Sequence, residues 1–147
     1  LIVAQKSTTT AAQLSKALCA SKLKWAVMKK EEFEGFTKSW NEFPNISYTD
    51  KGDAGVIRVS SENKEVVITA AYDCEEFYVD FNLDGEPLYA DWYESMEDPI
   101  EEVMEYTRNI VKRYVNNPVR VKTIGWFMFK RPVIEYKDNG IWRNVFE

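Results

Sequence analysis

From Ile46 to Trp92, hydrophobic residues recur mostly at every second position, which is the spacing of β-strands that bury one face. β-Branched residues fill Ala54–Ser60 and Glu65–Tyr72, and the polar residues 61–64 between them have the composition of a turn. Strands joined by such short connections pair in antiparallel fashion. This part of the chain is therefore predicted to form an antiparallel meander.

The pair Asp84-Gly85 predicts a tight hairpin, because aspartate and glycine both accept the positive φ angles of a two-residue turn. Hydrophobic and polar residues alternate on both sides of the pair: Phe77, Val79, Phe81 and Leu83 before it, and Leu88, Ala90 and Trp92 after it. The predicted meander thus has four strands.

Three helices are expected around the meander. A capping box at Thr10–Gln13 predicts the first helix, and aromatic residues at helical spacing predict a second from about Lys30 to Phe43, ended by Pro44. Asp98 and Pro99 predict the start of the third. Its apolar stripe comprises Ile100, Val103, Met104, Thr107, Ile110, Val111, Tyr114 and Val115.

The chain ends in further predicted strands at 119–129, 133–137 and 141–146, with a turn at Asn139-Gly140 and a bulge at Gly125. The predicted fold class is α+β, as one domain spanning residues 1–147. An antiparallel sheet, made of the four-stranded meander plus the C-terminal hairpin strands, packs with two N-terminal helices and one central helix, the helices on one face.

Several classes of function are excluded or made improbable by composition. The chain has no histidine, which excludes histidine-based triads, general bases and zinc ligands. Its longest strongly apolar run, Ile124–Phe129, is too short to span a bilayer. Cys19 and Cys74 are isolated, so we expect free thiols and a cytoplasmic location. No cofactor is expected.

Charge is strongly segregated along a chain whose net charge is −5. Residues 62–105 carry fifteen acids and one base, Lys64, whereas residues 106–147 carry nine bases and three acids. In one interpretation the acidic meander lies against the basic C-terminal strands and the two compensate. In the other, the acids form an exposed surface that repels nucleic acid and attracts a basic protein.

The second interpretation gives our leading hypothesis, a non-enzymatic protein-binding module of inhibitor, immunity or accessory type with a basic protein partner. The predicted interface residues are acids of the meander and one neighbouring tryptophan: Asp80, Asp84, Asp91, Trp92 and Glu94. Membrane association is not expected, and nucleic acid is the less favoured partner.

An alternative is a divalent-metal-dependent hydrolase or nuclease. Asp80, Asn82 and Asp84 followed by Gly85, with Asp91 further on, match part of a calcium loop. The preceding residues alternate as a strand instead of forming the helix that such loops follow, so we favour a simple hairpin. Glu135 and Lys137 match the second half of a metal-nuclease constellation, but no aspartate is placed to supply the first half.

A further alternative is a single-stranded nucleic-acid binder that uses the C-terminal strands. There, cations are interleaved with aromatic residues that could stack on bases. The set comprises Tyr114, Trp126, Phe127, Phe129, Arg131, Tyr136, Trp142 and Arg143. An aromatic sheet core with a solvated basic face would give the same pattern.

Overall fold

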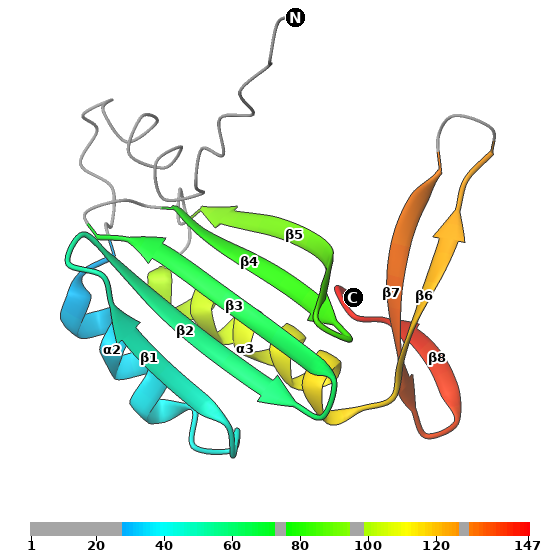
Figure 1. Cartoon of the computed structure of the whole chain (residues 1–147), viewed down its shortest axis with the longest axis horizontal. Helices are drawn as coiled ribbons and strands as arrows, with labels where there is room; N and C mark the ends of the chain where they lie inside the picture. The colour runs from blue at the N-terminus through cyan, green and yellow to red at the C-terminus, as the bar shows by residue number, and fades with distance from the viewer. Residues whose placement is uncertain (1–27, 73–75, 95–98, 127–129) are drawn as a thin grey trace, which may run out of the picture.

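The computed structural model describes residues 28–72, 76–94, 99–126 and 130–147. In these parts the chain folds into two antiparallel sheets and two helices, as Figure 1 shows, so the α+β class is confirmed. The larger sheet contains β1 (Ile46–Asp50), β2 (Ala54–Ser61), β3 (Lys64–Ala71), β4 (Glu76–Leu83) and β5 (Glu86–Glu94). The other elements are α2 (Lys30–Ser39), α3 (Ile100–Asn116), β6 (Val119–Ile124), β7 (Arg131–Asp138) and β8 (Ile141–Asn144).

The predicted meander is present, but it has five strands in the order β1-β2-β3-β4-β5 instead of four. The additional strand begins at Ile46, where the hydrophobic period changes. The C-terminal strands do not join this sheet; they form a separate sheet in the order β6-β7-β8. The helix predicted from Thr10 lies outside the described residues, as do Cys19, Cys74 and Asp98.

Both predicted two-residue turns are confirmed. Asp84 and Gly85 have φ angles of 55° and 81°, and Asn139 and Gly140 have φ angles of 48° and 87°. Positive φ at both central positions matches the right-handed twist of the flanking strands. The bulge predicted at Gly125 is wrong, since β6 pairs with β7 without a register shift and Gly125, with φ of 114°, follows the end of β6.

A bulge occurs instead between β4 and β5, where the register shifts at Phe81 and Asn82. Phe81 pairs with Tyr89, but its neighbour Asn82 pairs with Pro87. Leu88 is the extra residue of the bulge. Because of it, each later side chain of β5 points to the opposite face of the sheet from the one that unbroken alternation would give.

The two helices pack on the same face of the five-stranded sheet, and Figure 1 shows α3 running behind it. All eight residues of the predicted apolar stripe on α3 are buried. On the same face, near β1 and β2, α2 approaches so closely that a Cβ on Gly55 would lie 2.4 Å from Cδ1 of Phe33. We call this covered side the inner face of the sheet and the opposite side the outer face.

The second predicted helix is shorter than expected, because α2 ends at Ser39 instead of near Phe43. Trp40 leaves helical geometry with φ of −88° and ψ of 48°, although its amide still donates to the carbonyl of Phe36. Trp40 and Phe43 are nevertheless buried. Their spacing correctly indicated core positions, but a turn brings Phe43 to the core.

Aromatic packing joins the small sheet to the large one. The ring of Phe146, just after β8, lies 5.5 Å from Phe81 and 5.2 Å from Tyr89, measured between ring centroids. Arg113 on α3 donates a hydrogen bond of 3.1 Å to the carbonyl of Val145. Within the described residues, neither helix has the length and apolar character required to traverse a bilayer.

Candidate functional site

The outer face of the five-stranded sheet carries a group of carboxylates from two neighbouring strands and two turns. Strand alternation and register place Glu65 of β3 beside Asn82 of β4, and Asp80 and Glu76 further along β4. Glu62 and Asp84 occupy the two turns at one end of this face. We call these five residues, Glu62, Glu65, Glu76, Asp80 and Asp84, the acidic face.

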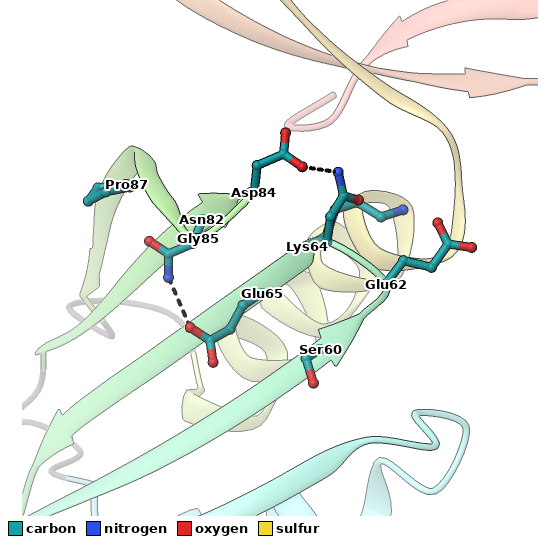
Figure 2. Close-up of a pocket in the computed structure, with 9 residues that line it drawn as sticks. Ser60, Glu62, Lys64, Glu65, Asn82, Asp84, Gly85 and Pro87 are labelled. Atoms are coloured by element: carbon teal, nitrogen blue, oxygen red, sulfur yellow. Dashed lines mark hydrogen bonds between the residues drawn. The ribbon is translucent and has the colours of Figure 1, made fainter.

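A concave surface of about 440 Å³ lies at the turn end of the acidic face. Figure 2 shows Glu65 accepting a hydrogen bond from the Asn82 amide and Asp84 facing the β2–β3 turn. The Asn82–Glu65 distance is 3.2 Å, and Asp84 accepts a bond of 2.6 Å from Asn63. The concave surface is lined by Ser60, Glu62, Asn63, Lys64, Glu65, Asn82, Asp84, Gly85 and Pro87.

Lys64 borders this concave surface, but its ammonium group points away from the carboxylates that line it. Its side chain is buried and runs to the C-terminus of α3. There Nζ donates hydrogen bonds of 2.8 Å to the carbonyl of Val115 and 2.7 Å to that of Asn117. Burial lowers the pKa of the Lys64 ammonium, while the helix-end carbonyls stabilise the cation. The one base of the acidic segment 62–105 therefore stabilises the C-terminus of α3 and does not neutralise the acidic face.

A second concave surface, of about 480 Å³, adjoins the first and shares Asn82 and Pro87 with it. Asp80 lines it, together with Arg58, Val67 and Ala90 among others. Burial raises the pKa of Asp80, and no ion pair or hydrogen bond is found for this carboxylate within the described residues. A cation supplied by a partner would stabilise the charged form of such a half-buried carboxylate, which has no counter-ion of its own in the described structure.

The structure brings together only some of the predicted interface residues. Asp80 and Trp92 lie on the outer face, and the side chain of Trp92 is 55% exposed. Asp84 lies in the turn at the end of that face. Asp91 points to the inner face, between Tyr89 and Tyr93, because of the bulge in β5. Glu94 pairs with Glu76 in the sheet, but its side chain lies outside the described structure.

The ion pairs bear directly on whether the C-terminal cations compensate the acidic segment. Arg120 pairs with Glu135 at 2.6 Å, and Arg143 pairs with Asp138 at 3.3 Å, all four within the small sheet. Among the described residues, no cation of β6–β8 pairs with a carboxylate of residues 62–105. Within the same described ranges, the cation that pairs with the acidic face is Arg58, which lies 3.4 Å from Glu65.

The metal-binding candidates do not converge. Asp80 and Asn82 point to the outer face, Asp84 lies in the turn, and Asp91 points to the inner face. In the described parts of the chain, no group of three or more potential ligands has the geometry to hold a metal ion.

The metal-nuclease pair lies on the small sheet, whereas the described members of the set of cations and aromatic residues are divided between the C-terminal part of the chain and α3. Glu135 and Lys137 share the solvent face of the small sheet, where Glu135 is engaged by Arg120 and Lys137 lies 5.8 Å from the ring centroid of Trp142. Tyr114 is buried, and its hydroxyl donates to the carbonyl of Asn82. Phe127 and Phe129 lie outside the described residues. The aromatic pattern thus combines core residues with a solvent-facing basic strand pair.

Sequence reasoning missed Glu62, Glu65 and Glu76 as members of the acidic face. Their positions could have been found by counting outward from the two-residue turns, because residues directly opposite each other in a hairpin share a face. The turn at 62–63 places Glu65 opposite Ser60. The bulge in β5 has no comparable local signal.

The chain matches no protein-family model, and no curated protein or solved structure shows detectable similarity to it. Its function is therefore inferred from the geometry and charge of its own residues.

Proposed function

We propose that this chain is a non-enzymatic protein-binding module, of inhibitor, immunity or accessory type, that captures a basic protein through the acidic face. The observation that carries the proposal is the pattern of ion pairs. Arg120 and Arg143 of the small sheet pair with Glu135 and Asp138 of the same sheet, and no cation of that sheet pairs with the acidic face in the described structure, where Arg58 is its counter-ion.

The shape of the outer face supports the same proposal. Its two concave surfaces, of about 440 and 480 Å³, are open recesses that can accept lysine or arginine side chains. Trp92 provides an exposed aromatic side chain beside them, and tryptophan is enriched among residues that dominate protein interfaces. Acids on the rim would accelerate association with a basic partner. We also propose a cytoplasmic location, because Cys19 and Cys74 form no evident disulfide framework.

The proposal is tested with an arginine-rich peptide as the probe, titrated into the full chain and followed by calorimetry. The test variant carries Glu65→Gln, Glu76→Gln and Asp80→Asn. We expect its affinity to fall by at least about tenfold, since each lost charge pair at an interface contributes on the order of 1 kcal/mol.

A matched control carries Glu31→Gln, Glu101→Gln and Glu102→Gln, which change the net charge equally on exposed helical positions. Its affinity is expected to stay within about twofold of the parent, because these residues lie outside the acidic face. Equal losses in both variants would mean that the peptide senses only net charge, and the proposal would be rejected.

A further inference from the structure

The β6–β7 hairpin projects from the body of the molecule, as Figure 1 shows, and one face of its sheet is basic. Register places Arg120 beside Glu135, Lys122 beside Val133, and Lys137 beside Trp142. Since Arg131 is four residues before Glu135 on the same strand, it points to the same side. We call Arg120, Lys122, Arg131 and Lys137 the basic face.

Most of the charge on the basic face is not neutralised within the small sheet. Its single carboxylate among the described residues is Glu135, which Arg120 already engages. Arg120 also lies 4.2 Å from the ring centroid of Trp142, a cation–π contact that holds its guanidinium in place. Lys122 and Arg131 are exposed and have no ion pair in the described structure. The face thus presents a stacked arginine together with two cations, Lys122 and Arg131, that no carboxylate neutralises in the described structure.

The basic face and the acidic face cannot neutralise each other inside one molecule. The small sheet is fixed to the inner side of the large sheet by Ile134 and Val145, which belong to the shared core, and by Phe146, which packs against that core. The acidic face points away from that core. Two complementary charged surfaces are therefore held apart by the packing of the two sheets.

We infer that the basic partner of the acidic face is the basic face of a second copy of this chain. This inference rests on the proposed function and names the partner of the same site. The contact is head-to-tail, so each added copy leaves one acidic and one basic face free, and the assembly can extend. Because the charged groups of both faces are accessible to solvent, electrostatic attraction steers the association, and the affinity weakens as the salt concentration increases.

Charge favours a second copy over nucleic acid as the ligand of the basic face. The whole chain carries a net charge of −5, and fifteen acids lie between residues 62 and 105. A uniformly charged polyanion would be repelled by this segment along its length, whereas another copy, although it has the same net charge, brings an acidic face whose carboxylates can match the basic face at short range.

The test uses sedimentation velocity on the full chain at low ionic strength. One variant has a neutralised acidic face (Glu65→Gln, Glu76→Gln, Asp80→Asn), and the other has a neutralised basic face (Lys122→Gln, Arg131→Gln, Lys137→Gln). The parent is expected to gain mass with concentration and to return to monomer at high salt. Each variant alone is expected to remain monomeric. An equimolar mixture should form a species of roughly twice the monomer mass that does not grow further.

Three results would overturn the inference: a parent that is monomeric at every concentration, self-association that survives either triple substitution, or a mixture that stays monomeric. Retention of a monomeric parent on a single-stranded oligonucleotide, lost in the basic-face variant, would assign that face to nucleic acid instead. If the arginine-rich peptide still binds the acidic face while self-association is absent, the proposed function stands and only the self-pairing fails. Thermal unfolding of each variant verifies that it is folded.

Discussion

Replacing Lys64 by methionine is expected to destabilise the fold measurably. The change removes two charge-assisted hydrogen bonds, of 2.8 and 2.7 Å, and a cation from the C-terminus of α3, while it keeps most of the aliphatic volume. A hydrogen bond to a charged group contributes about 1.5–3 kcal/mol, and relief of the buried ammonium offsets part of the sum, so we expect a net loss of about 2 kcal/mol. With an unfolding entropy of about 2.1 cal/mol/K per residue over 147 residues, the Tm should fall by roughly 6 °C.

Thermal unfolding followed by circular dichroism measures this difference. The matched control is Lys38→Met, which removes an exposed lysine that pairs with Glu34 at 3.0 Å along α2. Such helical pairs contribute about 0.2–0.5 kcal/mol, so the control should lower the Tm by no more than about 2 °C. Equal melting temperatures for the two variants would refute the assignment of the Lys64 charge to the helix end. The acidic segment would then have a base available to neutralise it.

Two further predictions concern the core. Gly55→Ala in β2 should destabilise by about 1–3 kcal/mol in chemical denaturation, because the new Cβ would meet the buried Phe33 ring of α2. Gly35→Ala, in open space on α2, should stabilise by up to about 1 kcal/mol. A harmless Gly55→Ala would disprove the close approach of α2. Burial raises the pKa of Tyr114, which donates to the carbonyl of Asn82, to about 12. Its stabilising effect is complete below the unfolded pKa of about 10 and is lost as pH rises through 12, so Tyr114→Phe should show a shallower alkaline loss of stability than the parent, and identical alkaline profiles would contradict this.

The elements that could be predicted from sequence are those specified by local chemistry. Asp84-Gly85 and Asn139-Gly140 form the expected turns because their backbone preferences are set by the residues themselves. The apolar stripe of α3 was predicted residue by residue because a helix has a fixed period. Both kinds of signal require no knowledge of distant parts of the chain.

The orientation of β5 could not be predicted, because it depends on one bulge. Without the extra residue, Asp91 would share the outer face with Asp80, and Leu88, Ala90 and Trp92 would point to the core. With it, Tyr89 and Tyr93 point inward and Trp92 is exposed. A one-residue shift exchanges every side chain between the two faces of a strand.

The separation into two sheets also depends on distant contacts. Alternating residues from Val119 onward indicate strands, but they do not indicate which sheet those strands join. The same limitation applies to charge: the segregation of acids and bases is visible in the sequence, whereas the pairing of Arg120 with Glu135 and of Arg143 with Asp138 requires the register of β6–β8. The sequence therefore predicted the acidic character of the candidate site but only some of the residues that form it.

The most direct measurement is an NMR titration of the Asp80 side-chain carboxyl in the free protein and with the arginine-rich peptide. If no cation of the chain neutralises the outer face at this position, the pKa of Asp80 lies above its ordinary value of 3.8 in the free protein and decreases when the peptide binds. A pKa below 3.8 in the free protein would show that the molecule already supplies the counter-ion, and it would contradict an acidic face open to a basic partner.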